Sequence, residues 1–319
     1  MKAIVSTQYG SPDVMKLGEV DKPEVADDAV LVRVRATSVN PHDWHSLRGE
    51  PYIMRMGEGL RRPKRTVLGI DAAGVVDAVG KDVTELHPGD EVFGVRSGAF
   101  AEYVSGHNFV PKPVGLTFEQ AAAVPVAGLT ALQGVRDKGG VQPGQRVLIY
   151  GAGGGVGSFA VQIAKALGAN VTGVTSTGNV EMIRSLGADE VIDYTREDFT
   201  RRGQRYDVIL DIGAKRPLLK LRRGLAPDGT LVLVGGSRGN WIGPIARALG
   251  ALVMSRFANQ TLRPFMSDVN TDDLLTLKEL IETGKVRPVI DRAYPLSETA
   301  EAVRYLETGQ ARGKVVITV

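Results

Sequence analysis

The sequence predicts an α/β protein with two domains, one of which is built on a doubly wound parallel sheet. Its 319 residues exceed the length of most single domains. The first third consists of short β-branched or alternating runs between Gly, Pro and Asp turns, which is typical of β-structure. From Arg146 onward, apolar strands alternate with a glycine-rich turn and helical segments, the order expected of a parallel sheet covered by helices.

The β-rich first third is clearest at residues 30–35 and 74–79, two apolar runs with β-branched residues. The pattern changes near residues 116–123, where Thr117 can cap a helix together with Gln120 and an alanine-rich stretch follows. We place a domain boundary at this change.

The predicted second domain, residues 122–266, begins with a βαβ unit. The glycine turn is expected at residues 151–157 and the first helix at residues 158–167. The strands are expected at residues 147–150, 171–174, 190–192, 207–211 and 230–234. The last helix and strand, near residues 298–307 and 314–319, look like a return to the first domain. That domain is therefore predicted to comprise residues 1–121 and 267–319.

The turn Gly151-Ala152-Gly153-Gly154-Gly155-Val156-Gly157 has glycine at every third position, directly after a strand and at the start of a helix. Glycines there let the backbone approach a pyrophosphate, and the free amides at the helix start favour the anion. The sequence therefore predicts a dinucleotide site, with contacts from Gly151, Gly154, Gly155, Val156 and Gly157.

The second strand of this unit ends at Thr175-Ser176-Thr177, where an NAD site would place Asp or Glu for the ribose hydroxyls. Because hydroxyl groups can donate to a 2′-phosphate and no carboxylate repels it, NADPH is predicted over NADH. Thr175 and Ser176 are the expected contacts, with Tyr194 and Arg184 nearby.

The composition excludes several classes of chemistry. The chain contains no cysteine, so disulfides, thiolate nucleophiles and cysteine-ligated zinc sites are ruled out, and redox chemistry needs a bound cofactor. The net charge of +3 gives little support to nucleic-acid binding, and the basic run at residues 61–65 is interpreted as a solvated loop. We expect neither a signal peptide nor a membrane span, hence no membrane partner and a cytoplasmic location.

Several motifs in order resemble the medium-chain dehydrogenase/reductase superfamily, in its zinc-free quinone oxidoreductase and enone reductase branch. Besides the glycine turn, the motifs are residues 38–44 (SVNPHDW), 68–74 (LGIDAAG), 88–92 (PGDEV), 127–132 (AGLTAL), 186–194 (LGADEVIDY) and 313–316 (GKVV). The resemblance covers nearly the whole chain. It implies a GroES-like β-barrel catalytic domain, a Rossmann cofactor domain, and an active site in the cleft between them.

The resemblance also implies that no metal is bound. Zinc-dependent relatives place Cys where this chain has Asn40 and His where it has Ile70, and they add a cysteine-rich lobe that is missing here. Asp71, His42 and His45 remain, but they do not rebuild a catalytic zinc site.

By the same resemblance, the protein is expected to transfer hydride from NADPH to a quinone or an α,β-unsaturated carbonyl. Asn40 and Asp43 are predicted to border the nicotinamide. Tyr52 is predicted to line the substrate site as an aromatic wall, and also to donate to a substrate oxygen or to protonate carbon. The other expected contacts are Trp44 as a substrate wall and Thr130, Gly235, Gly236 and Ser237 around the cofactor.

Two alternatives remain open. One is an NAD(P)-dependent alcohol dehydrogenase or aldehyde reductase, and the other is a non-catalytic nucleotide-binding relative that senses redox state or binds RNA. Residues 211–215 (DIGAK) depart from the family's Thr-Val-Gly-Gly pattern. The apolar segment at residues 239–254 is expected to cover the cleft or to form the interface of a homodimer.

Overall fold

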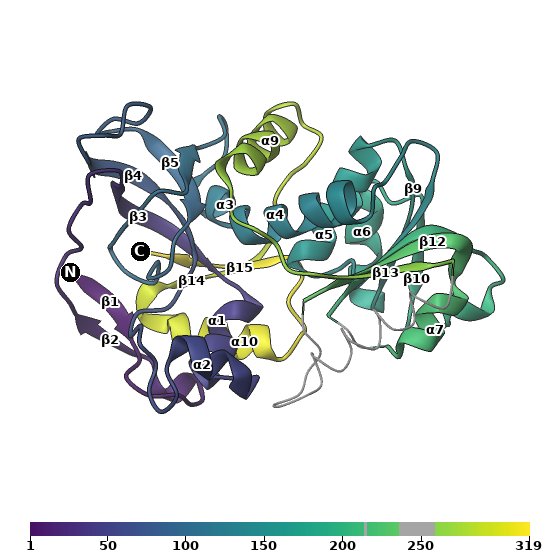
Figure 1. Ribbon diagram of the computed structural model, residues 1–319, viewed down its shortest axis with the longest axis horizontal. Helices are drawn as coiled ribbons and strands as arrows, with labels where there is room; N and C mark the ends of the chain where they lie inside the picture. The colour runs from purple at the N-terminus through teal and green to yellow at the C-terminus, as the bar shows by residue number, and fades with distance from the viewer. Residues whose placement is uncertain (214–215, 236–258) are drawn as a thin grey trace. The chain divides into compact units, whose positions relative to one another are not determined.

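The computed structural model describes residues 1–213, 216–235 and 259–319 (Figure 1). The chain forms two compact units. The first unit comprises residues 1–127, 269–283 and 288–319, and the second comprises residues 128–268 and 284–287.

The first unit is built on a seven-stranded sheet in which the end of the chain pairs with its beginning. The strand order is β14-β15-β3-β4-β5-β7, and β6 also pairs with β3. The strands are β3 (Val30–Val39), β4 (Asp71–Val79), β5 (Glu91–Val95), β6 (Tyr103–Gly106), β7 (Phe109–Pro111), β14 (Ile290–Pro295) and β15 (Lys314–Thr318). A separate hairpin joins β1 (Lys2–Val5) to β2 (Lys16–Glu19). Strand β15 pairs antiparallel with β3, so the last strand of the chain lies in the same sheet as its early strands.

The helices of the first unit are α1 (Pro41–Arg48), α2 (Arg55–Glu58), α3 (Phe118–Ala122), α9 (Thr271–Glu282) and α10 (Thr299–Glu307). Thr117 and Gln120 cap α3 reciprocally, which confirms the prediction made for this segment. Helix α1 was not predicted. It begins because Pro41 suits the first helical position and the Asp43 carboxylate accepts the backbone amide of Asn40 at 2.7 Å.

The second unit contains the predicted doubly wound sheet. Its six strands are all parallel, in the order β10-β9-β8-β11-β12-β13. They are β8 (Arg146–Tyr150), β9 (Asn170–Thr175), β10 (Glu190–Asp193), β11 (Tyr206–Ile212), β12 (Leu225–Val234) and β13 (Thr261–Phe265). The strand order reverses beside β8, which is where open sheets of this kind bind ligands at the carboxyl ends of the strands.

Among the described residues, this part of the chain contains the α-helices α4 (Pro125–Gln133), α5 (Gly155–Ala166), α6 (Val180–Ser185) and α7 (Leu218–Arg223). The strands place Leu148, Ile209 and Leu231 in a fully buried core, as expected for a sheet with continuous apolar runs. Across the residues that the structure describes, no helix has the length and apolarity needed to cross a membrane.

Candidate functional site

The glycine turn lies between the end of β8 and the start of α5. Gly151 has a φ of +91°, a conformation that favours glycine, and the amides of Gly151 and Ala152 each donate to the Val174 carbonyl at 3.1 Å. Gly154 is the N-cap of α5. The first amides of an α-helix have no partner within the helix, so the start of α5 offers its N–H groups to an anion.

The glycines of this turn differ in what surrounds them. A Cβ at Gly157 would lie 2.2 Å from the Gly151 carbonyl oxygen, so this glycine allows α5 to pack closely on the turn. A Cβ at Gly153 would lie 2.6 Å from the Thr175 hydroxyl. A Cβ at Gly154 would have the Gly151 oxygen, at 3.8 Å, as its one neighbour within 4 Å. The space beside Gly154 is therefore open to a ligand.

The end of β9 differs from the prediction in one respect. Thr175 is buried beneath the turn, Ser176 is half-buried, and Thr177 is exposed. The Thr177 hydroxyl donates at 2.6 Å to Asp193, a residue of the neighbouring strand β10. An acidic side chain therefore does lie near this strand end, supplied by the adjacent strand, and sequence reasoning missed it.

The carboxylate of Asp193 forms hydrogen bonds with Thr195 and an ion pair with Arg196. It accepts from the Thr195 amide at 2.9 Å and from the Thr195 hydroxyl at 2.7 Å, and Arg196 lies 3.4 Å away. The hydrogen bond from Thr177 holds the pKa of Asp193 below its usual range. Arg196 is thus a cation beside this strand end, whereas Arg184 pairs with Glu181 at 2.6 Å.

A buried polar cluster brings together two predicted site residues, Asn40 and Asp43, with Asp71 and Lys314. None of the four is more than 3% exposed. The Asn40 carboxamide donates to Asp71 at 2.8 Å and accepts from Lys314 at 2.6 Å. Lys314 also lies 3.4 Å from Asp71. Sequence reasoning did not foresee this ion pair, whose partners are 243 residues apart.

Burial and neighbouring charges set the ionisation of this cluster. Burial raises the pKa of Asp43 to about 7; the Asn40 amide opposes this rise and the Asp71 charge adds to it. Burial lowers the pKa of Lys314, while Asp71 and Asp43 oppose that change. Asp43 therefore exchanges its proton near neutral pH.

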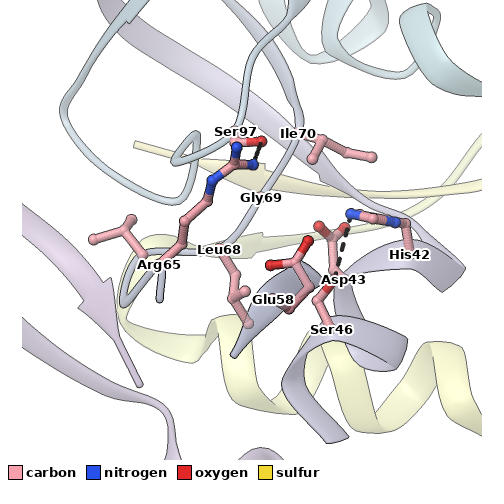
Figure 2. A pocket seen from close by; sticks show the side chains of 10 residues that line it. His42, Asp43, Ser46, Glu58, Arg65, Leu68, Gly69, Ile70 and Ser97 are labelled. Carbon is pink, nitrogen blue, oxygen red and sulfur yellow. Dashed lines mark hydrogen bonds between the residues drawn. The ribbon is translucent and has the colours of Figure 1, made fainter. Parts of the chain in front are cut away.

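A small cavity of about 20 Å³ lies beside Asp43, within the first unit (Figure 2). His42 and Ser46 of α1, Glu58 of α2 and the segment from Val67 to Ile70 line it, together with Arg65 and Ser97. The Ser46 hydroxyl lies 3.3 Å from the His42 ring nitrogen, and burial lowers the pKa of His42. The cavity has room for about one water molecule, far less than a quinone needs.

The two predicted aromatic contacts lie elsewhere and do not line this cavity. The Tyr52 ring lies 4.6 Å from the Arg55 guanidinium, which also covers Tyr9 at 4.5 Å. Trp44 stacks on His45 with ring centroids 3.7 Å apart, and it also packs against a core cluster of the first unit. The assignment of both residues to substrate remains a prediction.

The remaining predicted contacts belong to the second unit. Thr130 is buried in α4 and its hydroxyl donates to Ser267 at 2.9 Å. Tyr194 is 43% exposed after β10, and Gly235, with a φ of +76°, follows β12. Gly236, Ser237 and the segment 239–254 lie outside the described residues, as do two residues of the departure at 211–215.

Comparisons with known proteins agree with this geometry. Residues 26–133 match the Alcohol dehydrogenase GroES-like domain family, and residues 186–317 match the Zinc-binding dehydrogenase family. A 2-methylene-furan-3-one reductase of Solanum lycopersicum is 37% identical, across 99% of this chain and 79% of the relative. An NADPH-dependent alkenal/one oxidoreductase of Arabidopsis thaliana is 35% identical with the same coverage.

Solved structures also resemble the chain along its full length. The quinone oxidoreductase from Coxiella burnetii superimposes with a TM-score of 0.88 at 32% identity, covering 100% of this chain and 99% of that one.

Proposed function

The chain belongs to the medium-chain dehydrogenase/reductase superfamily, among its NAD(P)H-dependent quinone and enone oxidoreductases, and we propose that it uses NADPH to reduce such a substrate without a metal. The matches confirm the predicted GroES-like and Rossmann folds. The observation that carries the proposal is the glycine turn at the start of α5, with open space beside Gly154. This is the geometry that a dinucleotide pyrophosphate needs.

The residues of the second unit fit the cofactor. Gly155 and Val156, in the first turn of α5, are the proposed backbone-amide contacts for the pyrophosphate, whereas the Gly154 amide donates to the Gly151 carbonyl at 3.3 Å. Ser176, directly after β9, and Arg196, 3.4 Å from Asp193, are the proposed contacts for a 2′-phosphate. Bound NADPH supplies the hydride, and the protein holds and orients the reactants. Thr130, Tyr194 and the loop at residues 235–237 stay proposed contacts.

The residues do not fit the zinc that the second family's description implies. At the two positions that would supply ligands, Asn40 is held by the Lys314 ammonium and Ile70 is aliphatic. A cation next to Asp71 also opposes a second positive charge. Among the described residues, no three His, Asp or Glu side chains form a metal-binding group. We derive no catalytic step through a metal.

The proposed substrate is an α,β-unsaturated carbonyl or a quinone, in line with the names of the relatives above. Asn40 and Ile70 supply no zinc ligands, so no Lewis acid would polarise an alcohol oxygen. This favours the addition of hydride to a conjugated carbon over the oxidation of an alcohol. Turnover of an enone, a quinone and a simple aldehyde with NADPH distinguishes this proposal from an aldehyde reductase. Turnover of the aldehyde alone would contradict it.

Ser176→Asp is expected to reverse or abolish the preference for NADPH. The new carboxylate would repel a phosphate that carries nearly two negative charges, and the loss of one charged hydrogen bond corresponds to roughly tenfold in affinity. NADH affinity should stay the same or rise. The check is fluorescence titration of both cofactors, with Ser185→Asp, an exposed serine at the end of α6, as the matched control. Equal effects of the two substitutions would refute this assignment.

The remaining proposals come from the sequence alone. They are a cytoplasmic location, a homodimer, and a small-molecule substrate in place of a nucleic acid or a membrane partner.

A further inference from the structure

Lys314, at the start of β15, is the centre of the buried polar cluster. Its ammonium donates to the Asn40 side-chain oxygen at 2.6 Å and to the Val39 carbonyl at 3.2 Å, and it lies 3.4 Å from the Asp71 carboxylate. A lysine ammonium has three N–H groups, so these three acceptors satisfy it. A buried charge is costly unless it is paired in this way.

The Lys314–Asp71 pair fixes the orientation of the Asn40 carboxamide. The Asn40 oxygen faces the ammonium, while its nitrogen donates to Asp71 at 2.8 Å and to the Ser38 carbonyl at 3.4 Å. Turning the carboxamide by 180° would set N–H groups against the ammonium and oxygen against the carboxylate. The two charges therefore allow one orientation only.

Asn40 passes this constraint to the first turn of α1. Its backbone amide donates to the Asp43 carboxylate at 2.7 Å, so Asn40 and Asp43 are held together. Asp43 in turn borders the small cavity with His42 and Ser46 (Figure 2).

We propose that Lys314 is a positioning residue for the reduction, because its ammonium holds the Asn40 carboxamide, and through it the first turn of α1, in the orientation that the reaction needs. This inference rests on the proposed function, in which Asn40 and Asp43 belong to the reaction site. Lys314 acts through Asn40 and does not itself contact the substrate.

A matched pair of variants, Lys314→Gln and Lys314→Met, tests the inference. Both remove the charge, but glutamine alone leaves an N–H that can donate to the Asn40 oxygen. We expect both to lower Tm by about 10 °C. At a temperature where both are folded, kcat should stay within about threefold of wild type for glutamine and fall about tenfold for methionine, with NADPH affinity unchanged in both. Equal losses of kcat would show a merely structural role.

The double variant Lys314→Met with Asp71→Asn separates stability from positioning. Removing both charges leaves Asp43 as the ionisable group of the cluster, and this carboxyl is protonated and neutral below its pKa of about 7. At about pH 5, Tm should therefore recover to within a few degrees of wild type. We expect kcat to stay about tenfold low, because no charged group then fixes the orientation of the Asn40 carboxamide. A kcat that recovers together with Tm would overturn the inference.

A spectroscopic readout keeps this inference separate from the proposed function. Wild-type turnover of an enone or a quinone is measured first, and its absence contradicts the function alone. Independently of turnover, the side-chain amide protons of ¹⁵N-labelled Asn40, which donate to Asp71 in the wild type, should exchange slowly with solvent in the wild type and in Lys314→Gln. They should exchange fast in the double variant, which has neither the Lys314 ammonium nor the Asp71 carboxylate. Fast exchange in the wild type would contradict the positioning role.

Discussion

Gly154→Val is expected to lower NADPH affinity about a hundredfold while leaving Tm within a few degrees of wild type. Gly154 has a φ of −88° and a ψ of 179°, extended backbone that valine readily adopts, and a Cβ there would lie 3.8 Å from the Gly151 oxygen, an ordinary van der Waals contact. The valine side chain would fill the space proposed for the pyrophosphate. The loss of two charged hydrogen bonds, each worth about 1.5 kcal/mol, gives this magnitude.

Fluorescence titration with NADPH and a thermal melt check both parts of this result. Gly157→Val is the control, because its side chain would collide with the turn itself, where a Cβ would lie 2.7 Å from the Ala152 Cα. That variant should lose stability as well as cofactor. Wild-type affinity in a folded Gly154→Val protein would show that the cofactor does not bind at this turn.

The second large effect is a dependence of stability on pH that originates in Asp43. Its pKa is about 7 in the folded protein against 3.8 in the ordinary case, so the folded state holds a proton that the unfolded state has lost between these values. The free energy of unfolding therefore falls as pH rises from about 4 to about 7. A shift of about three pKa units corresponds to about 4 kcal/mol.

Asp43→Asn isolates this contribution, because a carboxamide does not ionise and its oxygen can still accept the Asn40 amide. Asp71 and Lys314 are the charged groups that act on Asp43, and both stay in place in the variant. Denaturant unfolding of both proteins at about pH 4 and about pH 8 measures the difference. The free energy of unfolding of the variant minus that of the wild type should be about 4 kcal/mol larger at about pH 8 than at about pH 4. A difference that does not change with pH would contradict the raised pKa.

The Rossmann half of the fold could be predicted from the sequence because local signals and the global pattern agree there. The glycine turn follows an apolar strand and opens a helix, and this context specifies the βαβ unit around β8, α5 and β9. Helix α1 was missed although Asn40, Pro41 and Asp43 carry the signals of a helix start. The helix has only eight residues, and the sequence around it has the pattern of β-strands.

The electrostatics of the site could not be predicted, since they depend on residues distant in sequence. Asp193 reaches the end of β9 only because β10 pairs with it in parallel, with Asp193 opposite Thr175. Lys314 meets Asp71 because β15 and β4 both flank β3. The hydrophobic pattern of a sequence does not show which strands pair or in which register. Asn40 was therefore predicted as a site residue without the Lys314–Asp71 ion pair that holds it.

The most direct test of the central claim follows deuterium from the cofactor into the product. The protein is treated with a chelator, shown by elemental analysis to hold no zinc, and then given an enone and NADPH deuterated at the reactive carbon of the nicotinamide. The account predicts undiminished turnover and a product with deuterium on the carbon β to the carbonyl. Turnover that is lost on chelation and restored by zinc, or a product without deuterium, would contradict it.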